Sequence, residues 1–184
     1  MSSDEMLVER ARSGDLASFE ELVERYRDLI VRVATRIVGP TEAEDVTQDV
    51  FLRAFHRLGQ FRGQAPFRAW LLRIAHNAAL TALKTKREEG EAVGEAVEVA
   101  DPGRRPAEEL EVSERRDRLA VKLREVQPTH RAVLVLRDLE GLSYEDIAEI
   151  TDSPVGSVKG RLFRARRELI EILRRNTYDW ELPR

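Results

Sequence analysis

Apolar side chains recur three and four positions apart through the first half of the chain, which is the spacing of the buried face of an α-helix. Asp15 is placed to cap one such helix, and Thr41 with Glu44 has the spacing of a capping box for the next. The predicted helices are a short one that ends near residue 13 and longer ones over 15–38, 41–58 and about 67–86. The pattern therefore predicts a helical unit in residues 1–88.

The same spacing separates buried from exposed positions within these helices. The third helix is expected to bury Val46, Val50, Phe51, Ala54, Phe55 and Leu58. On the helix over 67–86, one polar face carries Arg73, Asn77, Thr81 and Lys84. The loop over 58–66 holds Phe61 and Arg62, an aromatic residue and a cation with no obvious core to fill.

Helical periodicity disappears from residue 88 to about residue 111, where Glu, Gly, Pro and Ala dominate and no aromatic residue occurs. Such a segment buries little apolar surface and repels itself, so we expect a flexible acidic linker. The fold prediction is all-α, with two small helical domains. The predicted boundaries are a first domain at 1–88, a linker at 89–112, a second domain at 113–177 and a tail at 178–184.

A helix-turn-helix is predicted in the second domain. Ser143 and Asp146 form a capping box for a short helix, Thr151-Asp152 makes the turn, and Ser153 followed by Pro154 opens a longer basic helix. The inward stripe of that last helix is Val155, Val158, Leu162, Ala165 and Leu169. Its outer face carries Ser157, Lys159, Gly160, Arg161, Phe163, Arg164 and Arg167.

Phe163 is the informative residue of that outer face. A large aromatic ring directed away from the apolar stripe exposes surface to water, whereas it would be useful against a thymine methyl group or a sugar in the major groove. The alternative is that Phe163 packs on a neighbouring helix.

Charge is strongly segregated along the chain, although the formal total is only −3. Residues 53–87 hold eight Lys and Arg and no acidic residue, together with Phe55, Phe61, Phe67 and Trp70. Positive charge attracts a polyanion, and aromatic faces stack on unpaired bases, so this segment suits a partly single-stranded nucleic acid. The alternative is a solvated basic face with its rings in the core.

Composition excludes several other classes of protein. The chain has no cysteine, so disulfides and Cys-ligated zinc are excluded. His56, His76 and His130 are far apart in sequence, and a cation between Asp45 and Asp49 is no better an explanation than carboxylates facing a basic partner. We therefore expect no metal, no cofactor and no catalytic residue. Without a signal peptide or an apolar span, a cytoplasmic protein is expected, with no insertion into a membrane.

Three blocks in this order resemble a bacterial sigma factor of the extracytoplasmic function type. The block EAEDVTQDVFLRAFHRL, at 42–58, is similar to the family's region 2.2. The block FRGQAPFRAWLLRIAHNAALTALKTKR, at 61–87, is similar to regions 2.3 and 2.4. The block LRDLEGLSYEDIAEITDSPVGSVKGRLFRARREL, at 136–169, is similar to region 4.2. The resemblance covers nearly the whole chain.

The resemblance implies partners and roles for residues. Core RNA polymerase would dock on Asp45, Gln48, Asp49 and Arg53. The minus-ten element, opened to single strands, would contact Phe61, Arg62, Arg73, Asn77 and Lys84. The double-stranded minus-35 element would be read by Ser157, Lys159, Arg161, Phe163 and Arg164, with Arg166 or Arg167 on a phosphate. Gly160 stands where many relatives have Ser, which removes one hydroxyl from that surface.

The resemblance also implies an anti-sigma factor as a partner, and a non-catalytic initiation subunit whose reaction belongs to the polymerase. The alternative function is a sigma-like interaction protein that sequesters an anti-sigma factor without binding promoters. Such a decoy has no need of basic and aromatic surfaces on both domains, and this chain carries them on both.

Overall fold

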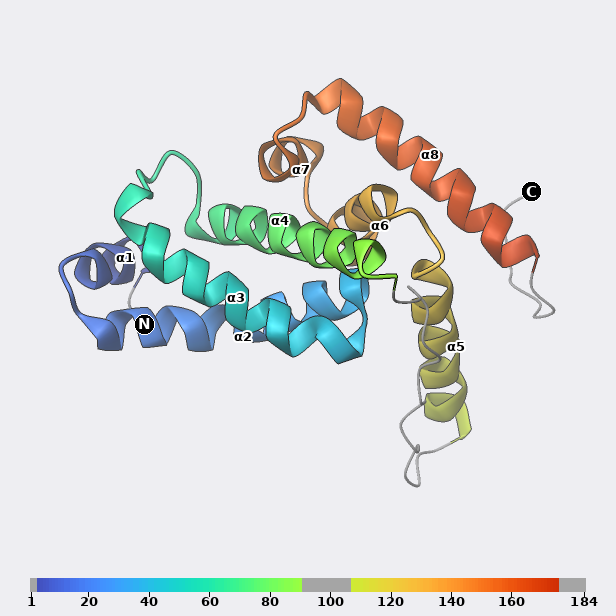
Figure 1. Cartoon of the computed structure of the whole chain (residues 1–184), viewed down its shortest axis with the longest axis horizontal. Coiled ribbons are helices and arrows are strands. Elements are labelled where there is room, and N and C mark those ends of the chain that lie inside the picture. Colours follow the sequence, from blue (N-terminus) through green and yellow to red (C-terminus); the bar gives the residue numbers. More distant parts are fainter. Residues whose placement is uncertain (1–2, 91–106, 176–184) are drawn as a thin grey trace.

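We describe the protein from a computed structural model, in which residues 3–90 and 107–175 are described (Figure 1). The described residues are helical throughout, apart from short turns and loops. The helices are α1 (Asp4–Arg12), α2 (Leu16–Val38), α3 (Pro40–Arg57), α4 (Phe67–Glu88), α5 (Ala107–Leu123), α6 (Pro128–Leu134), α7 (Tyr144–Thr151) and α8 (Val155–Arg174). The all-α prediction is confirmed for these residues.

Helices α1 to α4 form the first helical unit, in which α2 packs against α1, α3 and α4. Asp15 caps α2 as predicted, accepting a hydrogen bond from the amide of Ser18. The capping box predicted at Thr41 and Glu44 is wrong, because α3 begins at Pro40 and has no side-chain cap. Gly39 instead makes the corner with a φ of 97°, a conformation that favours glycine, and proline suits the first helical position.

Four aromatic rings from distant parts of the first unit form one cluster. The centroid of Phe67 lies 5.6 Å from that of Tyr26, 5.8 Å from that of Phe61 and 5.5 Å from that of Trp70. Phe61 is 8% exposed and Phe67 4% exposed. The expectation that Phe61 has no core to fill is therefore wrong, since it closes the loop before α4 over this cluster.

Helices α6, α7 and α8 form the second unit, with a π-helical turn (Val135–Leu139) between α6 and α7. The capping box of Ser143 and Asp146 is confirmed. Ser153 does not cap the last helix, because α8 begins at Val155 and the Ser153 hydroxyl donates to the carbonyl of Thr151. Asp152 makes the turn in the left-handed region, with a φ of 50°.

Helix α5 begins at Ala107, inside the segment predicted to be linker, so residues 107–112 are helical. The rest of the predicted linker, residues 91–106, and the predicted tail lie outside the described residues. In Figure 1, α5 projects away from the other helices, and it contacts α8.

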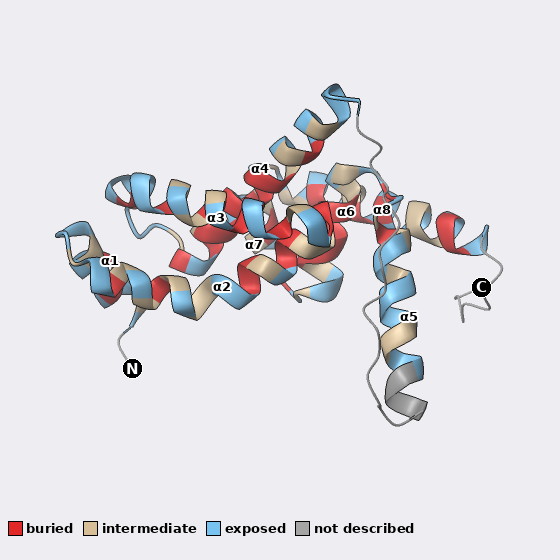
Figure 2. Ribbon diagram, turned by 60° about the horizontal axis from the view of Figure 1, so that its bottom comes forward, coloured by how far each residue is buried: buried red, intermediate tan, exposed pale blue. Residues whose placement is uncertain are grey.

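The two units pack together, and their buried side chains form one continuous cluster (Figure 2). Helix α7 lies against α4, while α6 contacts both α2 and α4. Arg131 of α6 is only 1% exposed and donates to the carbonyl of Ile37 near the end of α2, as well as to carbonyls of Arg124 and Val126. The placement of the second unit on the first is thus fixed by specific polar contacts as well as by packing.

Truncating a ring of the aromatic cluster tests its contribution to stability. We expect Phe67→Ala to lower the free energy of unfolding by about 3 kcal/mol, through lost burial and the cavity left behind. Phe163→Ala removes the same atoms from a ring that is 64% exposed, and we expect a change within about 0.5 kcal/mol. Urea unfolding followed by circular dichroism checks both, and equal losses would contradict the burial of Phe67.

Candidate nucleic-acid interface

One exposed polar face of α4 carries the residues predicted from the sequence. Arg73, Asn77, Thr81 and Lys84 are all exposed on it. Asn77 Oδ1 lies 3.2 Å from Nδ1 of His76, and Lys84 lies 3.8 Å from the carboxylate of Glu88. The face therefore offers cations and an amide along one side of a rigid helix, which suits contact with a nucleic-acid backbone.

At the start of α4 this face meets a cavity of about 180 Å³ beside the preceding loop. Arg62 and Arg73 line it together with the half-buried Trp70, and the ring of Phe61 forms part of its wall. Of the residues predicted to bind the minus-ten element, Arg62, Arg73 and Phe61 are thus brought together, while Asn77 and Lys84 follow along the helix. Phe61 contributes from the core and is not an exposed stacking surface.

The second unit reaches this same surface. Glu149 of α7 lines the cavity, and the carboxylate of Asp152 lies 3.5 Å from Nη2 of Arg73. The basic face of α4 is therefore partly covered by acidic side chains from the helix-turn-helix.

The four residues expected to contact the polymerase lie on two sides of α3. Asp45, Asp49 and Arg53 line a groove between α3 and α4, where Nε of Arg53 donates to Asp49 at 2.8 Å. Gln48 faces the other side, toward α2. The structure thus brings three of the four together and separates Gln48 from them.

An apolar surface beside Gln48 was missed in the sequence. Phe55 was expected to be buried, but it is 42% exposed and packs edge-on against Phe19 of α2, with 5.1 Å between ring centroids. Leu52 is 59% exposed. Together with Val23 and Phe51 these residues line a groove of about 360 Å³ between α2 and α3. The signal was Leu52, an apolar residue on the predicted polar side of the helix.

The outer face of α8 is largely as predicted. Phe163 is 64% exposed, and the guanidinium of Arg167 lies 6.0 Å from its ring centroid. The alternative that Phe163 packs on a neighbouring helix is therefore wrong. Ser157, Lys159 and Arg164 are also exposed, with the ammonium of Lys159 lying 5.3 Å from the ring centroid of Tyr144.

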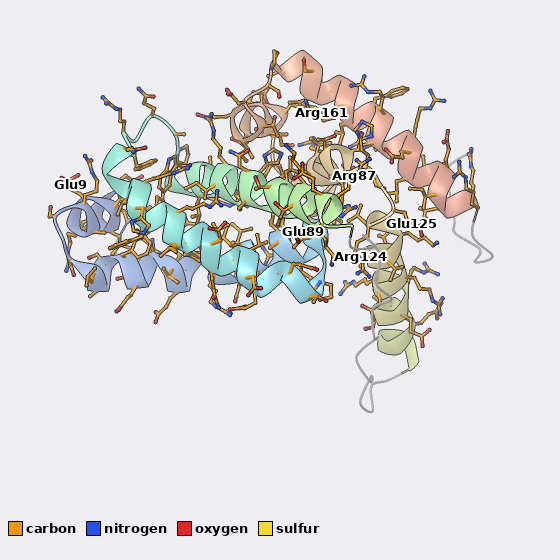
Figure 3. All side chains as sticks on the ribbon, in the orientation of Figure 1. Glu9, Arg87, Glu89, Arg124, Glu125 and Arg161 are labelled. Atoms are coloured by element: carbon orange, nitrogen blue, oxygen red, sulfur yellow. The ribbon has the colours of Figure 1, made fainter. Side chains whose placement is uncertain are left out.

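Arg161 departs from this group, because it is half-buried and lies on the side of α8 that faces the rest of the molecule (Figure 3). Its charge acts on His76 of α4, an imidazole 7% exposed. Burial lowers the pKa of His76, the hydrogen bond with Asn77 opposes that effect, and the charge of Arg161 lowers the pKa further.

Two features of the described residues bear on other classes of function. In residues 3–90 and 107–175, no group of three His, Asp or Glu side chains is placed to hold a metal ion. None of the helices described is long and apolar enough to cross a membrane.

Comparison with known families gives two matches that divide the chain as the fold does. Residues 22–89 match Sigma-70 region 2, and residues 116–169 match Sigma-70, region 4. The first match contains α3 and α4, and the second contains the helix-turn-helix.

Similar proteins cover almost the full length. The ECF RNA polymerase sigma-E factor of Haemophilus influenzae is 39% identical over 92% of this chain and 94% of its own. The RNA polymerase sigma-H factor of Pseudomonas aeruginosa is 37% identical over 92% of this chain and 93% of its own. Among solved structures, CnrH in complex with the cytosolic domain of CnrY matches with a TM-score of 0.69 and 29% identity, covering 96% of this chain and all of that one.

The buried imidazole of His76 makes stability depend on pH. Its pKa is lowered in the folded state, so below a pH of about 6.5 the unfolded chain binds the proton more readily and stability falls as the pH drops. We expect the free energy of unfolding to decrease between pH 7 and pH 5, by at most about 1.4 kcal/mol per pH unit from this residue. His76→Gln should flatten that slope, whereas His56→Gln, at an exposed position, should not. Urea titrations at several pH values measure both, and identical slopes would contradict the effect.

Proposed function

The chain belongs to the sigma-70 family, in its extracytoplasmic function group, and from this premise we propose how its surfaces divide the work of promoter recognition. A factor of this group binds core RNA polymerase, directs it to promoter DNA and supports melting and initiation. The two family matches, in the expected order along one chain, are the observation that carries the assignment.

The minus-ten element binds the face of α4 and the cavity at its start. Arg73, Asn77 and Lys84 follow the strand by charge and hydrogen bonding, and all three are exposed on one helix. Arg62 and Trp70 line the cavity, which offers an unpaired base a cation and an aromatic ring. A base held there offsets part of the free energy required to unpair it. Phe61 supports this cavity from beneath.

The minus-35 element is read by the outer face of α8. Phe163 is exposed at the centre of a cationic surface, and an apolar ring there contacts a thymine methyl group or a sugar in the major groove. Lys159 and Arg164 contact base edges beside it, and Arg167 and Ser157 contact the backbone. Arg161 joins these readers only after it leaves the first unit, because it now lies near His76.

Core polymerase docks on α3. Asp45, Asp49 and Arg53 form a charged edge, and the neighbouring groove adds Gln48 and the exposed Leu52. An apolar centre beside charged residues is the usual composition of a protein interface. The apolar groove therefore extends the docking surface expected from the charged residues alone.

We also propose that catalysis belongs to the polymerase and that the protein acts with it in the cytoplasm. An anti-sigma factor is a further proposed partner, as the family resemblance implies, and the similar CnrH was solved in complex with another protein, the cytosolic domain of CnrY. A decoy that only sequesters such a factor is the second candidate. Exposure of Phe163 among cations favours the DNA-binding factor, because a decoy has no use for that surface.

The reading surface is tested by Phe163→Ala combined with Arg164→Ala. We expect loss of promoter-specific transcription, by about thirtyfold or more if each of the two contacts contributes 1–3 kcal/mol. Binding to core polymerase should be unchanged. Transcription in vitro from a library of random promoters, with core polymerase added, measures promoter-specific transcription. Co-purification measures binding to core polymerase. Undiminished specific transcription would contradict the DNA-reading role of α8, whereas no promoter-specific transcription by the unchanged protein would favour the decoy.

The docking surface is tested by Asp45→Arg and, separately, by Leu52→Asp. Asp45→Arg reverses a charge at the edge of the proposed interface and Leu52→Asp places a charge in its apolar centre, so we expect each to weaken binding to core polymerase by about tenfold or more. Glu5→Arg reverses an exposed charge on α1 and serves as the control. Titration of labelled protein with core polymerase gives the affinities. If all three variants bind as the unchanged protein does, the docking face lies elsewhere.

A further inference from the structure

We propose that in the free protein the second unit is docked over the minus-ten surface and covers it with acidic side chains, so that promoter binding requires the two units to separate. This regulation rests on the function proposed for α4. It is carried by two sets of contacts, one that covers the surface and one, away from it, that holds the units together.

The covering contacts come from α7 and the turn that follows it. Helix α7 lies against α4 in Figure 1 and in the packing of the two units. Glu149 lines the cavity that holds Arg62 and Arg73, and Asp152 lies 3.5 Å from Arg73. Carboxylates thus stand beside the cations where phosphates of a strand would lie. A bound strand would meet both steric conflict with α7 and repulsion from these charges.

The covering contacts do not by themselves hold the units together. The side chain of Asp152 is 84% exposed and that of Arg73 is 44% exposed, and an ion pair this open to water contributes only about 0–1 kcal/mol. Stronger contacts are needed elsewhere.

Those contacts join the second unit to α2. They form a cluster of Glu140 from the second unit with Arg32 and Arg36 from α2, which we call the α2 latch. Glu140 follows the π-helical turn, and its side chain is only 5% exposed. Arg32 donates to its two carboxylate oxygens from Nε and Nη2, each at 3.1 Å, and Arg36 donates from Nη1 at 2.5 Å. A two-pronged pairing of this kind is among the strongest ionic contacts in proteins.

Arg131 adds a second hold beside the latch, through the carbonyl of Ile37. Both holds join the second unit to α2, whereas the covered surface is on α4. The latch can therefore be broken by mutation without touching a residue that is proposed to bind DNA.

The docked arrangement also occupies one reader of the minus-35 element. Arg161 lies near His76 on α4, while Phe163 and Arg167 point outward. Docking thus restricts both DNA surfaces in part, at the start of the α4 face and at Arg161 of α8. Separation of the units releases the two together.

Glu140→Arg tests the latch, because it places a third cation beside Arg32 and Arg36. We expect the units to separate. The chain contains no cysteine, so single labels can be introduced at Glu20→Cys on α2 and Glu171→Cys on α8, both exposed. Spin labels there should give one short distance in the unchanged protein and longer distances in Glu140→Arg. Adding Arg32→Glu and Arg36→Glu to Glu140→Arg restores opposite charges and should restore the short distance, which a misfolded protein would not do.

Binding of a fluorescent single-stranded oligo(dT) to the full chain tests the consequence. If the closed arrangement is favoured about tenfold or more, Glu140→Arg should tighten binding by a similar factor, since apparent affinity scales with the open fraction. Glu149→Gln and Asp152→Asn should each tighten it by about two- to fivefold through loss of repulsion. Glu145→Gln removes an equal charge from an exposed position on the same helix, outside the cavity, and should have less effect.

The label distances and the DNA affinities together distinguish failure of this inference from failure of the function proposed for α4. Two outcomes would overturn the inference alone. One is long distances between the labels in the unchanged protein. The other is a longer distance in Glu140→Arg without tighter DNA binding, while Arg73→Ala still weakens binding. If Arg73→Ala has no effect even in the separated Glu140→Arg protein, the proposed minus-ten surface fails, and the inference fails with it. Tighter binding that is lost on Arg73→Ala supports both.

Discussion

Two charged side chains of the second unit, Arg131 and Glu140, are almost removed from water, and both find partners on α2 of the first unit. A buried charge without a partner is strongly unfavourable, so these contacts restrict how the units can be placed. Burial lowers the pKa of Arg131 to about 10, which leaves the guanidinium charged at neutral pH. From this placement follow the position of α7 over α4 and the approach of Arg161 to His76.

Local structure was predictable wherever a few neighbouring residues determine it. Asp15 and the pair Ser143 and Asp146 cap helices because their side chains reach amides within three residues. The start of α3 was not predicted correctly, because Gly39 adopts a positive φ and leaves no role for a cap at Thr41. The start of α8 differs by one residue for a similar reason, since the chain leaves the turn at Asp152 through Pro154 before its first helical turn.

Positions that depend on distant partners could not be predicted from local spacing. Phe61 lies in a loop, and its burial depends on Phe67 and Trp70, which a later helix brings beside it. Glu140 has the sequence context of an ordinary surface acid, because its partners are more than a hundred residues away. The exposed faces of α4 and α8 were predicted from helical periodicity, which decides exposure within one helix, with Arg161 of α8 as the exception. How the two helices are placed relative to each other was not predicted.

The contact between the units combines an apolar cluster with polar contacts, and the two differ in what separation requires. Separating the apolar part exposes its surface to water at about 25 cal/mol per Å², a penalty that only contacts with partners can offset. Separating Glu140 from Arg32 and Arg36 loses strong hydrogen bonds, but each charged group then regains its hydration, so much of the loss is recovered. Contacts between Arg73 and Asp152 lose even less, because both side chains are already exposed. The polar contacts therefore order the closed arrangement while adding little to the free energy of opening, and the apolar packing is the part that polymerase and promoter contacts must offset.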